Sequence, residues 1–448
     1  MLLWLWTLGI WGDSLRIAPH KKLRPYELAR KREGWVSVGY PGIDYDALRG
    51  VGVSAVASIA YEGSKQDPTY EYEPYQHYFF FQGGLYQHDS RFFRFLYDAP
   101  WLGNRPYRVS LRLSHRQESQ GQFWGLGESF LRCFLKEPLP LFERELKRPR
   151  WNPQGYWETA LGLHHFYISH WQVWLSGERI AMQGLLRIIG GIRWIDEKVL
   201  SLRGRTYWLR TPDGRKVKAV QLPTMLDSAA EGYQLYPPPA YFAVRKWRSR
   251  LFVGGALVWD SRDFEIDPTR GWMIEVGHES LIPYLSTHKS YFSVRQYATL
   301  LRGKSETFRV LGAWHFLCST THGSRVFFTD YYTYNRWSDG QNLALLSGTS
   351  TLRAFRENRF VTAIAYLLQY ELRMRVAEVR IWRQHFIGGP LFFADVATGT
   401  DRLRVPRYFV WGLGTGARIL WNMTTVLRVD AAWGREGWQI HFHTGHTF

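Results

Sequence analysis

Apolar and polar residues alternate over long stretches of this chain. Between residues 107 and 114 every second residue is apolar, from Tyr107 to Leu113, and the intervening residues are Arg or Ser. Between residues 366 and 376 the even positions are apolar, and most odd positions are Gln, Glu or Arg. Successive side chains of a strand point to opposite faces, so both segments have one apolar and one polar side. Their length favours strands that cross a bilayer at a tilt, which need about nine to eleven residues.

Strand-like runs of this kind continue from about residue 34 to the last residue. Their approximate ranges are 36–42, 51–62, 76–88, 107–114, 157–174, 183–194, 251–261, 271–279, 290–301, 307–317, 325–334, 366–376, 391–397, 408–421, 425–433 and 438–448. About sixteen strands would return both ends of a barrel to the periplasm. The longer polar stretches 117–155, 198–240 and 335–360 are expected to be outer loops, and 101–104 and 267–270 periplasmic turns.

The composition points to a membrane barrel rather than a soluble domain. Aromatic residues make up 17% of the chain, although its mean hydropathy is polar. The sequence contains no apolar stretch of about 18 residues, the minimum for a transmembrane helix. A barrel explains both observations, because its strands alternate lipid-facing and lumen-facing residues and carry aromatic girdles. The predicted fold class is therefore all-β, a transmembrane antiparallel β-barrel with a long inward-folded loop.

The chain carries a formal net charge of +18. Its Arg residues are spread along nearly every segment and accompany no nucleic-acid-binding motif, which argues against nucleic acid as a partner. Dispersed Arg suits a charged lumen and loops among anionic head groups. We therefore expect outer-membrane lipid and lipopolysaccharide as partners, and a monomeric barrel in the bacterial outer membrane.

The first 33 residues differ from the rest. Residues 1–12 hold an apolar run of the length of a secretory signal, without a basic start or a clear cleavage site. We interpret them as a signal peptide remnant, with an uncleaved hydrophobic tail as the alternative. Residues 13–33 are expected to form a basic linker, and 34–448 the barrel domain. The two cysteines, Cys133 and Cys318, either form one disulfide or remain free thiols.

Several short motifs follow one another in a fixed order. They are Phe123–Gly127; a hairpin with Asp260, Arg262, Asp263, Pro268 and Gly271; a loop segment with Gly348, Leu352, Arg353 and Phe355, followed by 358–360; 370–373; Leu391–Asp395; 412–418; 428–430; and the terminal Phe448. Together these segments resemble the BamA/TamA-type outer-membrane barrels, also called the bacterial surface antigen family. The resemblance covers roughly residues 34–448.

The resemblance implies a latch inside the barrel. In the family, the Arg of the loop motif reaches into the lumen and pairs with a Glu and an Asp on the two following strands, which correspond here to Arg353, Glu371 and Asp395. Glu371 also falls on the polar face of its predicted strand. The latch either only holds the barrel shut or also serves assembly. The chain departs from the motif at Ser347 and Ala354, where the family prefers Gly, and only about 33 residues precede the barrel, so we expect a barrel-only relative without POTRA repeats.

Three further groups of residues have more than one interpretation. His441, His443 and His446 have a spacing that could hold zinc, but no Cys or carboxylate lies nearby in sequence, so polar filling of the lumen is preferred. We attribute the carboxylates near Asp260 to turn chemistry. Ile440, Phe442 and Phe448 are expected to share one face of the last strand and resemble a terminal assembly signal.

Three functions remain open at this point. The first is insertion or export of proteins or lipids at the outer membrane, by loop gating and lateral opening between the first and last strands. The second is a passive pore or structural barrel. The third, an enzyme, is disfavoured because the sequence carries no nucleophile motif, phosphate loop or cofactor fingerprint. We therefore expect no catalysis, no metal and no cofactor.

Overall fold

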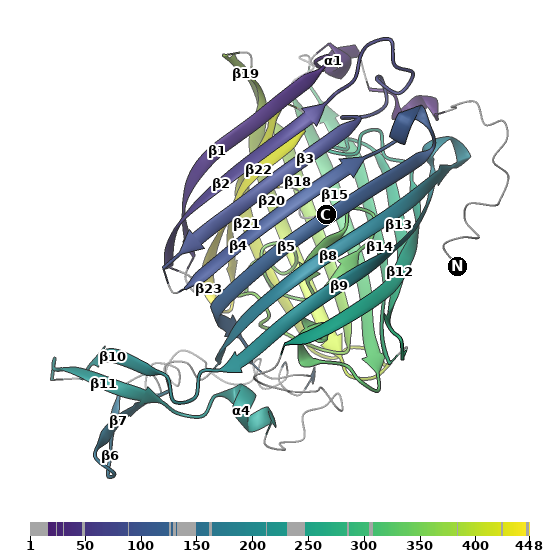
Figure 1. Ribbon diagram of the computed structural model, residues 1–448. Helices are drawn as coiled ribbons and strands as arrows, with labels where there is room; N and C mark the ends of the chain where they lie inside the picture. The colour runs from purple at the N-terminus through teal and green to yellow at the C-terminus, as the bar shows by residue number, and fades with distance from the viewer. Residues whose placement is uncertain are drawn as a thin grey trace.

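A computed structural model describes most of the chain. The described residues are 17–23, 25–29, 31–46, 50–87, 89–124, 127–128, 131, 149–160, 164–211, 213–230, 247–284, 286–303, 308–382, 384–422, 424–444 and 448. The expected signal peptide, residues 1–12, lies outside them. One large antiparallel sheet curves into a barrel of tilted strands (Figure 1).

The main sheet contains 17 strands. The strands are β1 (Trp35–Asp46), β2 (Gly50–Tyr61), β3 (His77–Tyr86), β4 (Ser90–Ala99), β5 (Tyr107–Gln122), β8 (His165–Ala181), β9 (Leu186–Ser201), β12 (Arg248–Asp260), β13 (Gly271–Ile282), β14 (Thr287–Arg302), β15 (Arg309–Gly323), β18 (Ile364–Arg375), β19 (Ala377–Ile381), β20 (Gln384–Thr400), β21 (Phe409–Trp421), β22 (Thr425–Gly434) and β23 (Gly437–Thr444). Because β18 and β19 both pair with β20, they share one position in the wall. Apart from this shared position, each strand of the main sheet pairs with the strands of this sheet that precede and follow it in the chain. The first pair is β1 with β2, and the last is β22 with β23. Among the described residues no pairing joins β1 to β23, so the sheet is open at this seam.

The alternating pattern is confirmed in the wall. On β13, Trp272 and Val276 are exposed on the outer face, whereas Met273 and Glu275 are buried on the inner face. A lipid-embedded barrel has an apolar outer face, which contacts lipid, and a polar inner face, which lines the lumen. Its backbone groups are paired within the sheet. No helix among the described residues is long and apolar enough to cross a membrane.

The expected strand number holds, but two individual assignments were wrong. The structure contains β4 at Ser90–Ala99, which the sequence reading missed because its Phe and Arg residues do not alternate cleanly. The run 325–334, predicted as a strand of the wall, instead contains a 3-10 helix, η5 (Phe328–Tyr332). Its aromatic side chains are buried against other residues inside the barrel rather than facing lipid.

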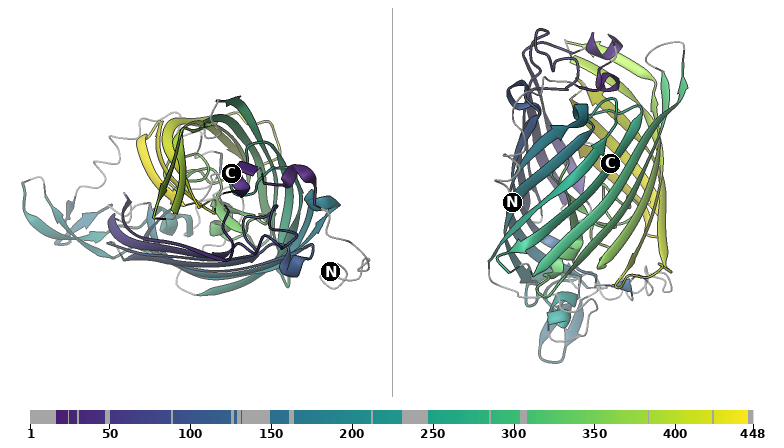
Figure 2. Two further views of the ribbon diagram at one scale, coloured as in Figure 1. Left: turned by 90° about the horizontal axis from the view of Figure 1, so that it is seen from above. Right: turned by 90° about the vertical axis from the view of Figure 1, so that its right-hand side faces the viewer.

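The connection between β15 and β18 folds into the lumen. It contains η5 and a short hairpin of β16 (Thr333–Arg336) and β17 (Gln341–Ala344). Figure 2 shows loop segments inside the ring of strands when the barrel is seen from above. Trp337, Leu352 and Phe355 of this inward loop pack with wall residues such as Trp174 and Leu367 in one hydrophobic cluster. The stretch 335–360 is thus an inward loop, as the motif implied, and not an outer one.

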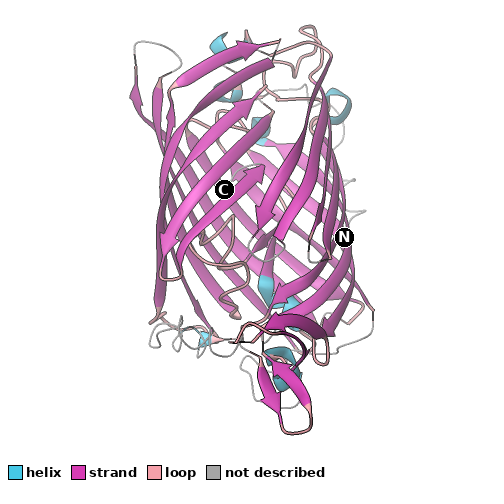
Figure 3. Ribbon diagram, turned by 90° about the vertical axis from the view of Figure 1, so that its left-hand side faces the viewer, coloured by secondary structure: helices cyan, strands magenta, loops and turns pink. Residues whose placement is uncertain are grey.

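A small second sheet projects from one end of the barrel, here called the loop end (Figure 3). Its strands are β6 (Arg150–Asn152), β7 (Tyr156–Thr159), β10 (Thr206–Arg210) and β11 (Lys216–Gln221), in the order β10-β11-β7-β6, and α4 (Met225–Ala230) follows β11. The four strands come from two different connections, β5–β8 and β9–β12. Both lie in stretches that the sequence predicted to be long loops, apart from β7.

The opposite end, here called the turn end, carries the N-terminal segment and the short turns. This segment contains η2 (Pro19–Lys21) and α1 (Pro25–Leu28), and two short turns contain η3 (Leu102–Asn104) and η4 (Met182–Gly184). Leu23 is 2% exposed and packs with Phe264, Leu420 and Val426. Residues 17–33, expected to be a linker, are therefore packed against the barrel, because Leu23 completes an apolar cluster at this end.

Candidate functional site

The inward loop brings Arg353 to the barrel wall. The loop segment is closed by Ser347, whose Oγ accepts a hydrogen bond from the backbone N of Arg359 at 2.8 Å. Gly348 has a φ of 123°, a conformation that favours glycine. Leu352 and Phe355 flank Arg353 and are buried in the central hydrophobic cluster. Ser347, a departure from the family motif, thus has a structural role, and the apolar neighbours hold the loop against the wall.

Arg353 pairs with both carboxylates that the resemblance implied. Its Nε and Nη2 donate to the two carboxylate oxygens of Asp395 at 2.8 and 2.7 Å, and its Nη1 donates to Glu371 Oε1 at 2.6 Å. All three side chains are at most 1% exposed. The fork of the guanidinium matches the Asp395 carboxylate in a bidentate geometry, which fixes its direction as well as its distance. One loop residue is therefore bound to both β18 and β20.

Three further charged residues complete this cluster, which we call the latch. Asp430 on β22 lies 3.5 Å from Arg353 Nη1, and Arg428 Nε lies 2.9 Å from Asp430 Oδ2. Arg373 Nε donates to Glu371 Oε2 at 2.7 Å. The latch thus holds three guanidiniums and three carboxylates, a balance that offsets the cost of burying charge. The sequence reading missed Arg373, Arg428 and Asp430 as members of the latch, although all three lie on predicted strands, because only strand register brings them together.

Neutral groups support Arg353 from other directions. Its guanidinium lies 3.5 Å from the ring centroid of Phe393. Its carbonyl oxygen accepts a hydrogen bond from His441 Nε2 at 2.7 Å, so the loop also contacts the last strand, β23. Gln369 Nε2 donates to the carbonyl oxygen of Thr351 at 2.8 Å. Contacts of the latch therefore reach β18, β20, β22 and β23, which is most of the wall up to the seam.

A second cationic contact holds the far side of the same loop. The Arg359 guanidinium lies 3.7 Å from the ring of Trp124, a residue of the Phe123–Gly127 motif. Arg359 Nε is also 2.6 Å from Glu436 Oε1, in the turn between β22 and β23. Both Phe123 and Trp124 are buried. Two motifs that are far apart in the sequence thus meet at the inward loop.

Ala354, the second departure from the motif, is accommodated by glycines of the wall. Ala354 is fully buried. A Cβ placed on Gly412 would lie 2.3 Å from the Ala354 Cβ, and one on Gly434 would lie 2.7 Å from it. Both distances are below van der Waals contact, so these two positions must remain glycine while Ala354 is present. Gly412 of the predicted 412–418 segment and Gly434 of β22 therefore provide the space for the loop.

The hairpin motif performs turn chemistry at the turn end. Arg262 binds Asp260 with two hydrogen bonds of 2.9 and 2.8 Å, and Asp263 Oδ1 accepts one from the backbone N of Thr269 at 2.8 Å. A Cβ on Gly271 would lie 2.4 Å from the carbonyl oxygen of Ser261. These contacts fold residues 261–270 into a fixed turn between β12 and β13. Pro268, the remaining motif residue, lines a cavity behind this turn.

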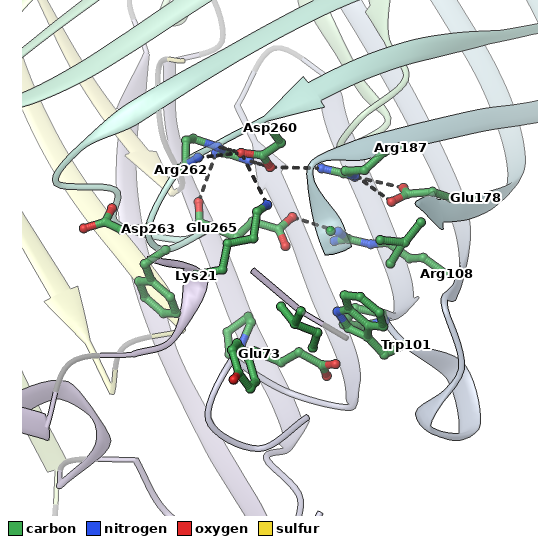
Figure 4. Close-up of a pocket in the computed structure, with 17 residues that line it drawn as sticks. Lys21, Glu73, Trp101, Arg108, Glu178, Arg187, Asp260, Arg262, Asp263 and Glu265 are labelled. Atoms are coloured by element: carbon green, nitrogen blue, oxygen red, sulfur yellow. Dashed lines mark hydrogen bonds and ion pairs between the residues drawn. The ribbon is translucent and has the colours of Figure 1, made fainter. Parts of the chain in front are cut away.

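The turn reaches across the end of the barrel. Arg418 Nη1 donates to Asp267 Oδ1 at 2.7 Å, and Arg375 pairs with the other oxygen of this carboxylate. Figure 4 shows the pocket on the other side of the turn, where Lys21 of the N-terminal segment approaches Asp260. Arg187, from β9, donates to Glu178 in the same view at 2.6 Å. Charged pairs thus close the turn end together with the N-terminal segment.

The terminal signal residues do not share one face. Ile440 and Phe442 are 65% and 63% exposed on the outer face of β23, whereas Phe448 is 3% exposed. Its ring lies 5.2 Å from that of His315 and 5.2 Å from the Arg373 guanidinium, inside the lumen. The expectation that Phe448 lies beside Ile440 and Phe442 was wrong, because aromatic and cationic partners inside the barrel bind its ring.

Other sequence-level candidates are placed as follows. His441 contacts the loop, the side chain of His443 and the whole of His446 lie outside what the structure describes, and no group of three metal-ligating side chains occurs among the described residues. Cys318 forms no disulfide with any described residue, and Cys133 lies outside the described residues.

Comparisons with known proteins identify the family. Residues 216–448, more than half of the chain, match the Omp85 superfamily domain, and residues 13–76 match a domain of unknown function (DUF5982). No curated protein matches the sequence. The match to 13–76 runs across the boundary at residue 34 that the sequence reading placed before the barrel.

Solved structures with a similar arrangement are distant in sequence. BamA from Haemophilus ducreyi lacking POTRA domains 1–3 is 10% identical, with 92% of this chain and 69% of that chain covered and a TM-score of 0.44. CdiB from Acinetobacter baumannii is 11% identical, with 92% and 59% covered and a TM-score of 0.45. CdiB from Escherichia coli is 10% identical, with 91% and 59% covered and a TM-score of 0.48. This chain spans less than two thirds of either CdiB chain. On the match of residues 216–448, the chain belongs to the Omp85 superfamily.

Proposed function

We propose that this barrel takes part in inserting or exporting proteins or lipids at the bacterial outer membrane, without catalysing a reaction. The observation that carries the proposal is the latch, which binds the inward loop to strands β18, β20, β22 and β23 next to the open seam. Membership of the Omp85 superfamily supports an outer-membrane location and a role in protein insertion or export.

The mechanism follows from the seam and the loop. The edges of β1 and β23 carry backbone N–H and C=O groups that are not paired with each other, and an unpaired strand edge is a template for another strand. β23 has 8 residues, fewer than its partner β22 with 10. A client strand would add to this edge, while the latch keeps the adjoining strands in place. Client proteins or lipids and the surrounding outer-membrane lipid are the partners of this mechanism.

The filled lumen favours this role over that of a passive pore. Trp337, Leu343 and Phe355 of the inward loop pack in one cluster with wall residues. A loop packed in this way obstructs the lumen and would have to leave before solutes pass. A pore or a structural barrel remains the alternative that the experiment must separate from the proposal.

The test compares Arg353→Ala with Arg356→Ala in the same loop. Each variant is reconstituted in liposomes and supplied with an unfolded outer-membrane barrel as client, and insertion is followed by the client's resistance to protease. We expect wild type and Arg356→Ala to insert the client, and Arg353→Ala to insert far less. Ionic conductance of the same three proteins in planar bilayers is the second measurement. No insertion by wild type, together with steady conductance, would overturn the proposal in favour of a pore.

A further inference from the structure

A cavity of about 200 Å³, partly open to solvent, lies in the lumen between the 261–270 turn and the tip of the inward loop. It is separate from the latch. Part of its lining is apolar or aromatic and comes from Tyr75, Tyr78, Leu96, Ile266, Val426 and Phe448. The other part is charged, with six arginines and three carboxylates: Arg108, Arg112, Arg187, Arg262, Arg295, Arg336, Asp98, Glu265 and Asp339. The cavity therefore combines an apolar wall with a cluster of guanidinium groups.

Four of these arginines are neutralised by carboxylates of the protein. Arg108 donates to Asp98 and to Glu265 at 2.7 and 2.8 Å. Arg187 pairs with Glu178 at 2.6 Å, Arg262 with Asp260 at 2.8 Å, and Arg336 Nε with Asp339 at 2.9 Å. These pairs are bidentate or nearly so, which is the strong form of the interaction.

Arg112 on β5 has no carboxylate of its own. Its Nη1 donates to the carbonyl oxygen of Gly340 at 2.7 Å, and its buried Nε has no hydrogen-bond partner among the described residues. Two carboxylates favour its charged form from a distance: Asp339, which Arg336 binds through both oxygens, and Asp98, which binds Arg108. Within the described part of the chain, Arg112 therefore has no carboxylate in hydrogen-bond contact.

Arg295 on β14 differs in having one carboxylate partner, Glu275, which it contacts only at long range. It is 3% exposed, its Nη1 approaches the Met273 sulfur at 3.4 Å, and its Nη2 lies 3.5 Å from Glu275 Oε2. That carboxylate already accepts hydrogen bonds from Tyr291 and from the backbone N and hydroxyl of Ser338. The Arg295 Nε has no partner among the described residues. The contact with Glu275 is long, and Glu275 is held more closely by neutral donors than by Arg295.

Arg112 and Arg295 both interact with Asp339. Asp339 interacts electrostatically with Arg336, Arg295 and Arg112, so three guanidiniums surround one carboxylate. A buried guanidinium without a matched anion is costly, and an added anion with two or three oxygens removes this cost through charge-assisted hydrogen bonds. An attached alkyl chain would gain free energy by covering the aromatic wall.

We propose that this cavity binds an anionic amphiphile, with a phosphate or carboxylate head group at Arg112 and Arg295 and an alkyl chain against Tyr78, Val426 and Phe448. The site does not depend on the latch or on an assembly activity. Its ligand is defined by its chemistry, a head group with several anionic oxygens attached to an apolar chain.

The test uses monododecyl phosphate as the probe and the full barrel in dodecyl maltoside, a neutral detergent with the same alkyl chain. Native mass spectrometry counts the bound probe on wild type, on Arg112→Gln/Arg295→Gln and on Arg94→Gln. Arg94 is the matched control, because it lies on the face of β4 that also carries Leu96 and Asp98 but does not line the cavity. We expect one tightly bound probe on wild type and Arg94→Gln, and an affinity weaker by about tenfold or more for the double variant, since a loss of about 1.4 kcal/mol is tenfold.

Two further arms keep the proposal open to contradiction. Gly340→Ala keeps all charges and is the second variant, for the case that the double variant does not fold. Its Cβ would lie 2.5 Å from Arg112 Nε and displace the guanidinium, so we expect weaker probe binding here as well. Inorganic phosphate is titrated in parallel. If it binds as tightly as the amphiphile, the ligand is a free anion and the amphiphile proposal is wrong. Equal probe binding by all variants would overturn the site itself.

Discussion

The inner faces of the first and the last strands of the wall differ in kind. On β1 to β3 the buried lumen-facing side chains are mostly apolar, as at Val38, Val56 and Phe80. On β18 to β22 charged side chains are buried among apolar ones, as at Glu371, Asp395 and Arg428, and these three bind the inward loop. Both groups of strands lie next to the same open seam.

This difference indicates which side of the seam is the more mobile. Apolar contacts are non-directional and tolerate small shifts, whereas the bidentate pair of Arg353 and Asp395 holds one geometry. We therefore expect the carboxyl-terminal strands and the inward loop to move as one unit, and the amino-terminal strands to shift relative to it more readily. Four predictions follow, ordered from the largest expected effect.

Removing Arg353 has the largest effect. Arg353→Ala leaves Glu371 and Asp395 buried with too few cationic partners, and breaking a buried pair in this way costs about 3 to 5 kcal/mol. The temperature at which unheated protein loses its compact gel migration is expected to fall clearly. Arg356→Ala in the same loop is the control. An unchanged transition temperature in Arg353→Ala would contradict the difference proposed between β1–β3 and β18–β22.

Gly412→Ala tests the space that the wall leaves for the loop. Its new Cβ would overlap Ala354, and overpacking of a core costs about 1 to 3 kcal/mol. Ala354→Gly removes the overlapping methyl group, so the double variant should recover most of the loss. A double-mutant cycle on thermal unfolding measures this coupling. Additive effects of the two substitutions would show that Ala354 and Gly412 do not interact.

Conservative substitutions on the inner faces of β1–β3 and of β18–β22 should differ in their cost to stability. Phe80→Leu on β3 replaces one apolar side chain with another and is expected to cost less than about 1.5 kcal/mol. Asp395→Asn keeps the shape of the side chain but removes the charge that Arg353 requires, so its cost should be larger. Chemical unfolding of both variants measures the difference. If Phe80→Leu is the more destabilising, the apolar wall is not the tolerant one.

The smallest effect concerns the N-terminal segment, which contacts the end of β2. The backbone N of Arg32 donates to Glu62 at 2.8 Å, and Lys31 Nζ donates to the carbonyl oxygens of Tyr70 and Glu73. Burial raises the pKa of Glu62 from 4.5 to about 7 and lowers the pKa of Lys31 from 10.5 to about 8.

The sign of the pH dependence follows from these shifts. Because the docked segment favours protonated Glu62, docking is strongest below pH 4.5 and weakens as the pH rises to about 7. Deprotonation of Lys31 restores stability only above about pH 8. Hydrogen exchange of residues 17–33, corrected for its intrinsic pH dependence, should therefore increase between pH 5 and 7. Glu62→Gln should flatten this increase, and an unchanged slope in that variant would contradict the assignment.

The missed and mistaken strands show what local patterns do not resolve. Arg325 to Tyr334 is rich in aromatic residues and reads as a strand, but the structure buries it in the lumen. β4 was missed because its residues do not alternate cleanly. Its pairing with β3 and β5 nevertheless holds it in the wall. A propensity signal describes how well a segment suits a pleated surface; it does not say which surface the segment meets.

The latch was predicted only in part for a similar reason. Arg353, Glu371 and Asp395 were found through the order of motifs. Asp430 and Arg428 were seen on a strand, but their role depends on β22 lying two positions from β20 in the sheet. Phe448 was assigned to the outer face by alternation, whereas its partners His315 and Arg373 lie inside the barrel.

The sequence by itself determined the class of this protein. Alternating apolar and polar positions and a high aromatic content were sufficient for a membrane barrel, because these features depend on the period of the strand and on the bilayer. The inward loop was implied only by the resemblance of the ordered motifs to the BamA/TamA-type family. Only the tertiary structure decided which charges meet, that residues 17–33 pack against the turn end, and that the seam between β1 and β23 is open. These features depend on register and on contacts between segments that are distant in the chain, and local periodicity carries no information about either.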